Sequence, residues 1–517
     1  MNANGGFLMQ KRKLSLAVLL AVVFLANFII GCSPSTGDVS STGGSPSSSN
    51  NTLDTESNDS NIIGDTSTPG TQSDSSTQTS TPGTNNPSGP STTSSENNNV
   101  TPSTKIDLKG RTIKILYGTY DAAAEASSAA GKYAIAQRKK IEEKYNCKIV
   151  PEAINYETFM PKLLMGDSSG ADIIDFCGTM LVGMVKNELV YPLDELVDLS
   201  QSHFDTDAMK NIRYFGHYYG AIPERTGFDN IGTQLVMFFN KRLVKNAGYD
   251  PDSLYKMQEN GTWTWDKFAE IAGKITDTSK GIYGIGNGYR DNYLWMSLML
   301  SNGQDLIANE NGKPVFNISN PKSLEALEFW EKISGNLYTP SDTTQDAKFI
   351  QGNIGFLPQY VNRMDYSNFK NMQDDYGIIC FPKGPSANRY YSPISYITGW
   401  SIPANVLRND DANHTLGKAL AAIISDLCKP AVPTNDANKI TQITFESLVR
   451  DQGSLDMLNK LADPKLRIVT KYYEAVDFAM TFNSALLKVA NGTLDINTAV
   501  RQNKDSLSKQ YQDFLPH

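Results

Sequence analysis

Residues 111–117, RTIKILY, and residues 171–176, ADIIDF, are the two stretches that decide the fold. The first alternates basic and β-branched residues as a half-buried strand does, and the second is an apolar run typical of a buried strand. Between them lie a helical pattern through residues 132–145 and a short apolar run at 147–150, and residues 181–193 continue as a helix. Strands that alternate with helices predict an α/β fold built on a parallel sheet.

Two helix starts are readable further along the chain. The stretch WTWD predicts a helix N-terminus with Thr264 as the N-cap and with Trp263 packed on Phe268. Asn320-Pro321 opens a second helix, in which Trp330 falls on the apolar face. Both patterns favour tryptophans that serve the core rather than a ligand.

The body of the chain, residues 105–517, is long enough for two or three domains and is weakly acidic. The whole chain has 517 residues and a formal net charge of -8. Residues 1–32 carry +3 and residues 33–104 carry -7, which leaves -4 for the body. Because it has no basic surplus to neutralise phosphates, the composition argues against binding to nucleic acid.

The first 32 residues predict an export signal. Three basic residues at positions 11–13 precede residues 14–30, an apolar stretch interrupted only by Ser15 and Asn27. The ending IIGC resembles the bacterial lipobox, in which the cysteine is lipid-modified. We therefore expect Cys32 to anchor the protein in the lipid bilayer, at the outer face of the cell membrane. An uncleaved membrane-spanning segment is the alternative.

Residues 33–104 have the composition of a disordered tether. This stretch contains 20 Ser, 15 Thr, 9 Asn, 7 Gly and 7 Pro, and it has no aromatic residue, no Lys or Arg and no Cys. Such a chain cannot bury enough apolar surface to offset the entropy of ordering it. As a flexible coil it would have an r.m.s. reach of roughly 45 Å.

Strings that match catalytic motifs lack the context that the chemistry needs. Residues 166–170, GDSSG, match the nucleophile elbow, but a helical stretch precedes them and a strand follows. Ser506 and Lys509 lack companion motifs, and Tyr289 stands where a dinucleotide loop that begins with Gly284 and Gly286 needs its third glycine. The 4 histidines show no metal-ligand spacing. We expect no enzyme, no cofactor and no metal, although a carboxylate pair for glycoside hydrolysis stays open among the 55 acidic residues.

With Cys32 assigned to lipid, four cysteines remain for the body: Cys147, Cys177, Cys380 and Cys428. An even number in an exported protein allows three disulfide pairings. Their positions in or beside apolar segments favour buried free thiols instead. Both alternatives stay open.

Several segments, in order along the chain, resemble the extracellular solute-binding proteins of sugar ABC importers. They cover most of residues 110–405 and are Ser169–Ile173, Glu188–Asp194, Tyr218–Pro223, Phe239–Lys241, Gly261–Phe268, Phe349–Pro358 and Phe381–Pro385. The resemblance implies a two-lobed α/β clamp of the periplasmic-binding-protein type (type II), with a hinge and without catalysis. It further implies a monomer that captures a sugar or oligosaccharide and delivers it to the subunits of an ABC permease.

The same resemblance sets the expected domain boundaries. The first lobe comprises residues 105–240 and about 401–443, and the second comprises about 241–400 and 444–517. Ligand is expected between the lobes, where closure is favoured if the ligand contacts both.

Ligand-binding residues are expected among aromatic and polar groups in loops that face this cleft, because sugars present apolar C–H faces and hydroxyl groups. Trp400 is the best single candidate, and Trp295 is next, with burial in the core as its alternative. The other candidates near strand ends are Tyr117, Asp121, Asp175, Tyr360, Arg363 and Tyr396. The small-residue-rich loop at 122–130 departs from the family's sugar-binding patterns.

Two other functions remain as alternatives. One is a membrane-anchored glycoside hydrolase or lyase, which a facing pair of carboxyl groups would favour. The other is a lipid-anchored sensor that reports ligand to a membrane kinase.

Overall fold

The computed structural model describes residues 106–515, except 119, 226–230, 289–292, 312, 339–343, 368, 395–396, 464 and 469–471. The predicted signal, lipobox and tether lie outside these residues. Within the described part of the chain, no helix is both long and apolar enough to cross a membrane.

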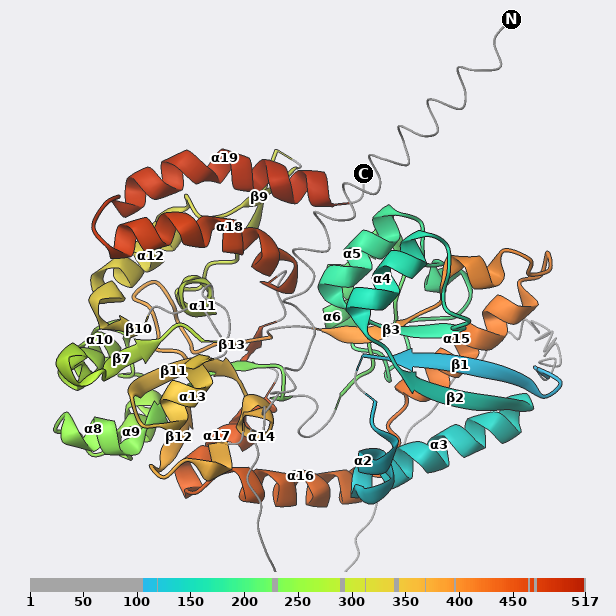
Figure 1. Ribbon diagram of the computed structural model, residues 1–517, viewed down its shortest axis with the longest axis horizontal. Coiled ribbons are helices and arrows are strands. Elements are labelled where there is room, and N and C mark those ends of the chain that lie inside the picture. The colour runs from blue at the N-terminus through green and yellow to red at the C-terminus, as the bar shows by residue number, and fades with distance from the viewer. Residues whose placement is uncertain are drawn as a thin grey trace, which may run out of the picture. The chain divides into compact units, whose positions relative to one another are not determined.

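The first lobe is built on a four-stranded sheet with the strand order β14-β3-β1-β2 (Figure 1). Its strands are β1 (Arg111–Tyr117), β2 (Cys147–Ala153), β3 (Ile173–Cys177) and β14 (Thr398–Ser401). β1 pairs in parallel with both β2 and β3, which confirms the expected parallel sheet, and β14 joins β3 antiparallel. Its helices are α2 (Ala122–Ser127), α3 (Ala129–Tyr145), α4 (Tyr156–Leu164), α5 (Gly178–Lys186), α6 (Thr206–Met209) and α15 (Thr415–Cys428).

The second lobe is built on a five-stranded mixed sheet with the order β10-β7-β11-β6-β12. Its strands are β6 (Leu235–Asn240), β7 (Tyr283–Gly286), β10 (Leu337–Tyr338), β11 (Ile354–Tyr360) and β12 (Tyr376–Ile379). β10, β7 and β11 run parallel, whereas β6 is antiparallel to both β11 and β12. Its helices are α8 (Lys241–Asn246), α9 (Ser253–Glu259), α10 (Trp265–Ile275), α11 (Tyr293–Ser301), α12 (Pro321–Ile333), α13 (Thr344–Ile350), α14 (Arg363–Tyr366), α17 (Gln452–Leu461), α18 (Tyr472–Ala490) and α19 (Ile496–Phe514).

The second sheet is covered on both faces, as the side chains of β6 show. Leu235, Met237 and Phe239 belong to one apolar cluster, and Val236 and Phe238 belong to another. Because side chains alternate along a strand, these two clusters lie on opposite faces of the sheet. The first lobe has a separate apolar cluster of its own. Short strand pairs complete the fold: β4 (Arg213–Tyr214) with β5 (His217–Tyr218), β8 (Ile307–Glu310) with β9 (Lys313–Phe316), and β13 (Ser392–Pro393) with β15 (Arg467–Ile468).

The strands of the two sheets place the passages between the lobes a few residues away from the expected lobe boundaries. β6 already belongs to the second sheet, so the first crossing precedes residue 235 instead of following 240. β14 belongs to the first sheet, so the return is complete by Thr398. A further passage uses α16 (Thr434–Leu448), which lies against both α3 and α17 and contains the expected boundary at 443. The hydroxyl of Tyr133 on α3 donates to Asp436 on α16 at 2.6 Å.

The helix expected at 181–193 starts earlier and ends earlier, because α5 spans Gly178–Lys186. Glu188 adopts a left-handed conformation with φ 55°. The N–H of Leu189 donates back to the carbonyl of Met184 at 2.9 Å. This pattern is a Schellman motif, which satisfies the last carbonyls of a helix and stops it.

The two predicted helix starts are confirmed by α10 and α12. Trp263 is buried and its ring centroid lies 6.0 Å from that of Phe268, as expected. Trp330 is also buried. Thr264 occupies the N-cap position, but its side chain accepts no capping hydrogen bond.

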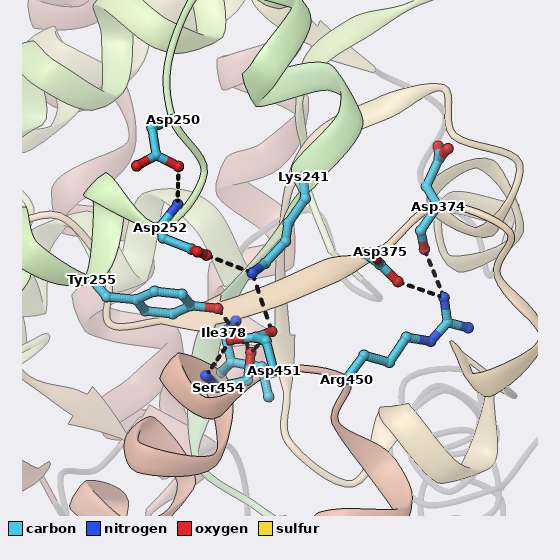
Figure 2. Close-up of polar contacts among 10 residues, drawn as sticks. All are labelled: Lys241, Asp250, Asp252, Tyr255, Asp374, Asp375, Ile378, Arg450, Asp451 and Ser454. Atoms are coloured by element: carbon cyan, nitrogen blue, oxygen red, sulfur yellow. Dashed lines mark hydrogen bonds and ion pairs between the residues drawn. The ribbon is translucent and has the colours of Figure 1, made fainter.

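A polar network holds the segment that follows α16 on the second lobe (Figure 2). The Nζ of Lys241 lies 2.8 Å from a carboxylate oxygen of Asp252 and 3.4 Å from one of Asp451. Asp451 also caps α17 by accepting the N–H of Ser454 at 2.8 Å. The hydroxyl of Ser454 shares a hydrogen bond with that of Tyr255 at 2.9 Å. Asp451 therefore joins a helix cap to an interhelical ion pair.

We expect Asp451→Ala to lower the free energy of unfolding by about 1–2 kcal/mol, because the α17 cap is lost together with the partner of Lys241. Urea denaturation measures the change. Glu259→Ala is the matched control, since the exposed pair of Glu259 with Lys460 at 3.1 Å also joins α9 to α17. Exposed pairs contribute little, so equal losses in the two variants would contradict the role assigned to Asp451.

Candidate functional site

Three predicted residues lie in one row across neighbouring strands of the first sheet. Tyr117 ends β1, and continuing the parallel register of Leu116 with Ile174 by one residue places it beside Asp175. On the other side of β3, Asp175 is paired with Trp400 of β14. Residues in register share a face of a sheet, and the rings of Tyr117 and Trp400 meet edge to face with centroids 4.8 Å apart. The sheet thus joins residues that are 283 positions apart in the chain.

The carboxylate of Asp175 lies in the middle of this row. One of its oxygens accepts the N–H of Gly118 at 3.0 Å and faces the hydroxyl of Tyr156 at 3.5 Å. A Cβ at Gly118 would lie 2.2 Å from that hydroxyl, so only glycine permits the approach. Burial raises the pKa of Asp175 to about 6, against the opposing effects of the Gly118 N–H and the charge of Arg225.

Aromatic rings continue beside the row. The ring centroid of Tyr120 lies 5.6 Å from that of Tyr117, and Trp400 is half-buried at the edge of the first lobe's apolar cluster. Burial raises the pKa of Tyr117 to about 12, although the nearby Arg138 acts in the other direction. Tyr117 therefore remains a neutral phenol. Together these rings offer apolar faces and the two phenol hydroxyls of Tyr117 and Tyr120.

Two other candidates, Trp295 and Asp121, have roles in the fold itself. Trp295 is fully buried in α11, packs against Phe482 with ring centroids 5.6 Å apart, and donates its indole N–H to Asn483 at 3.0 Å. These contacts match the core alternative stated for Trp295. Asp121 is the N-cap of α2 and accepts the N–H groups of Ala123 and Ala124. The structure does not bring either residue into the row.

In the second lobe, Tyr360 at the end of β11 lies close to Arg363 at the start of α14. The guanidinium of Arg363 is buried against the carboxylate of Asp346, with its Nε at 2.8 Å, and its Nη1 lies 3.5 Å from the Tyr360 hydroxyl. Gln359 donates to the other oxygen of Asp346 at 3.0 Å. Arg363 therefore serves first to neutralise a buried acid. Tyr396 lies outside the described residues.

Asn287 was not predicted, and it lies just beyond β7 at the same end of the second sheet. The N–H groups of Asn287 and Gly288 donate to the Oε1 of Gln345 at 2.6 and 3.1 Å. The Oδ1 of Asn287 is buried and has no hydrogen-bond partner in the described part of the chain. A buried acceptor without a donor is costly, and a ligand hydroxyl would satisfy it. The signal in the sequence was the glycine-rich stretch 284–288, which was considered only as a dinucleotide loop.

Tyr156 and Tyr120 were also missed on the first lobe. Tyr156 follows β2, a third parallel strand, and the rule that ligands bind at carboxyl ends of strands applies to that loop too. Tyr120 lies three residues after the end of β1. Nothing in the sequence indicated that Arg138, which lies within α3, would be near the candidate site.

The arrangement can bind a polar solute that has apolar faces, and it has no built metal site. No group of three or more His, Cys, Asp or Glu side chains within the described residues could hold a metal ion. Cys380 and Cys428 are buried free thiols, Cys147 is a half-buried one, and Cys177 is buried. Burial raises the pKa of the Cys380 and Cys428 thiols to about 12, which makes them poor nucleophiles.

Comparisons with known proteins agree with this fold. The family model of bacterial extracellular solute-binding proteins matches residues 136–416, which is more than half of the chain. No curated protein sequence matches the chain. Solved structures with similar folds include several with less than 20% sequence identity.

Three of these structures are informative about the fold. The cyclic α-maltosyl-1,6-maltose binding protein of Arthrobacter globiformis has a TM-score of 0.57 and 13% identity, with 78% of this chain and 100% of that chain covered. An ABC transporter solute-binding protein of Thermotoga lettingae bound with α-D-tagatose has a TM-score of 0.51 and 17% identity, covering 78% and 100%. An ABC substrate-binding protein of Listeria monocytogenes in complex with cycloalternan has a TM-score of 0.50 and 18% identity, covering 78% and 98%. The predicted periplasmic-binding-protein fold is confirmed.

The pKa of Asp175 predicts how stability depends on pH. A carboxyl group that binds its proton more tightly in the folded state destabilises the fold as the pH rises from its ordinary pKa of 3.8 through about 6. We therefore expect Asp175→Asn to raise the melting temperature above that of the wild type at about pH 7.5, and to have little effect at about pH 4.

Differential scanning calorimetry at the two pH values measures this difference. Asp207→Asn is the control, because Lys210 lowers the pKa of Asp207 and the variant should gain no stability at neutral pH. A shift for Asp175→Asn that is the same at both pH values would contradict the buried, proton-linked carboxyl group.

Proposed function

Because this chain belongs to the bacterial extracellular solute-binding protein family, we propose that it captures a sugar or an oligosaccharide and delivers it to the subunits of an ABC permease. The observation that carries the proposal is the row of Tyr117, Asp175 and Trp400 at one edge of the first sheet. Aromatic faces suit the apolar C–H faces of a sugar ring, and a carboxylate suits its hydroxyl donors. The family binds solutes and does not catalyse reactions, so the anchored hydrolase is not proposed.

The second lobe would supply the remaining hydrogen bonds. Asn287 directly follows β7 and Tyr360 is the last residue of β11, so both lie at the carboxyl ends of parallel strands, which is where α/β sheets bind ligands. A ligand that contacts both lobes favours the closed state over the open one by its differential affinity. We propose that a monomer in this closed state is the form offered to the permease.

We also propose that the protein is a lipoprotein on the outer face of the cell membrane. The sequence IIGC at residues 29–32, which follows an apolar stretch, supports lipid attachment at Cys32. The Ser/Thr-rich composition of residues 33–104 supports a long flexible connection between the anchor and the binding body. Such a tether would let the body search for ligand and still reach its permease.

A thermal-shift screen over mono- and oligosaccharides tests the proposed ligand class. The panel includes α-D-tagatose, cycloalternan and cyclic maltosyl-maltose, the sugars of the three similar structures. A ligand present at 100 times its dissociation constant should stabilise the protein by about 2.7 kcal/mol. Amino acids and polyamines serve as controls. Stabilisation by these and not by any sugar would overturn the assignment.

We expect Trp400→Ala to weaken binding of the sugar found in the screen at least about tenfold, because stacking on an aromatic ring contributes on the order of 1–3 kcal/mol. The unfolding free energy of the ligand-free protein should stay within about 1 kcal/mol, since a half-buried ring leaves a smaller cavity than a core residue. Titration calorimetry and urea denaturation measure the two quantities. Trp295→Phe is the control, and it should lose stability and keep its affinity. The opposite pattern would transfer the anchor role to Trp295.

We expect Cys32→Ser to abolish incorporation of labelled fatty acid and to release the protein into the medium or leave an uncleaved precursor. Metabolic labelling followed by fractionation measures both effects, and Cys147→Ser is the matched control in which lipid labelling is retained. Fatty acid that is still incorporated into Cys32→Ser would show that the lipobox interpretation is wrong.

A further inference from the structure

The segment at 122–130, which departs from the family's sugar-binding patterns, forms α2 and the start of α3, and an ion pair joins these two helices. Glu125 of α2 accepts both Nη groups of Arg138 of α3, at 2.7 and 2.5 Å. The exposed fractions of the two side chains are only 18% and 12%. A bidentate pair with this little exposure is geometrically specific and is screened far less than a surface pair.

The backbone is shaped to let α2 approach α3 this closely. A Cβ at Gly131 would lie 2.0 Å from the carbonyl oxygen of Glu125, so any larger residue there would push the two segments apart. Asp121 caps the start of α2, and Ser128 caps α3 by accepting the N–H of Gly131 at 3.0 Å. The segment between the caps is therefore held at both ends as well as by the ion pair.

The ion pair is linked to both tyrosines beside the row. Tyr120 directly precedes Asp121, the N-cap of α2, so the pair that fixes α2 also fixes the start of the chain segment that carries Tyr120. The ring centroid of Tyr120 lies 5.6 Å from that of Tyr117, and the ring of Tyr117 in turn lies edge to face with that of Trp400, at an interplanar angle of 82°. In addition, the charge of Arg138 opposes the larger effect of burial on the pKa of Tyr117. Glu125 is thus connected to Trp400 through α2, Tyr120 and Tyr117.

We propose that Glu125 and Arg138 are positioning residues that hold Tyr117 and Tyr120 in place, so that Trp400 is presented to ligand in a preformed orientation. This inference rests on the proposed sugar-binding role of the row, because it assigns the pair to that same site. The physical reason is that a bound ring gains most from a stacking partner whose rotamer is already fixed. Arg138 would act through Tyr117 and not by touching the ligand.

Tryptophan fluorescence tests the proposal without any ligand. The chain has 5 tryptophans, and four of them, Trp263, Trp265, Trp295 and Trp330, are 0–4% exposed. Quenching by acrylamide therefore reports mainly on Trp400, which a Trp400→Phe variant verifies by losing the quenchable component.

In Arg138→Met and in Glu125→Gln, we expect the quenching constant of this component to rise about twofold, because release of Tyr117 removes the ring that packs against the indole and so exposes more of it. The double variant should add little to either single change, since both break one interaction. Arg138→Lys, which keeps the charge without the planar fork, should fall between wild type and Arg138→Met. If Arg138→Met fails to fold, the milder variant Glu125→Gln tests the positioning role.

The matched control breaks another ion pair of the same lobe. Arg111 pairs with Asp172 at 2.8 Å, and Arg111 lies at the opposite end of β1 from Tyr117. Arg111→Met should leave the quenching of Trp400 unchanged. Folded Glu125 and Arg138 variants with wild-type quenching would overturn the positioning role. If quenching changes as expected while no sugar binds, the positioning role stands and the proposed function fails.

Discussion

The antiparallel pairing of β14 with β3 is the constraint on which the candidate site depends. The backbone of Trp400 is paired on both sides. On one side it lies opposite Asp175 in β3, and on the other it exchanges two hydrogen bonds of 2.9 Å with Ala221. A slip of one residue would turn its indole to the other face of the sheet. Gly399 makes the arrangement possible, since a Cβ there would lie 2.3 Å from the Ala221 carbonyl. The bridge between Trp400 and Ala221 also brings together the two segments of the first lobe that adjoin the chain's passages between the lobes.

Much of the first lobe could be predicted from local sequence. The strands at 111–117 and 171–176 and the helix through 132–145 lie within a few residues of β1, β3 and α3. The spacing of apolar residues and the length of each segment are enough to predict such elements, without information about the rest of the molecule. The candidates Tyr117 and Asp175 followed from the same patterns, because strand ends of a parallel sheet are where loops carry ligand groups.

The rest depended on contacts between residues that are far apart in the chain. No local signal shows that Trp400 would pair beside Asp175, or that Arg138 inside a helix would reach Tyr117. Trp295 was the second candidate for a ligand anchor, with the core as its alternative, and its burial is set by Phe482 and Asn483 from α18. The left-handed Glu188 that ends α5 early is also not a residue that propensity would select for this conformation.

The two lobes contribute different kinds of chemistry to the candidate site. The first lobe presents rings and a carboxyl group on strands and an ion-paired loop, which are rigid supports. In the second lobe Arg363 is already paired with Asp346, whereas the buried Oδ1 of Asn287 has no hydrogen-bond partner within the described residues. A ligand hydroxyl would satisfy this acceptor. Such a contact would favour closure if it forms only in the closed state, since only contacts made in the closed state alone can shift that equilibrium.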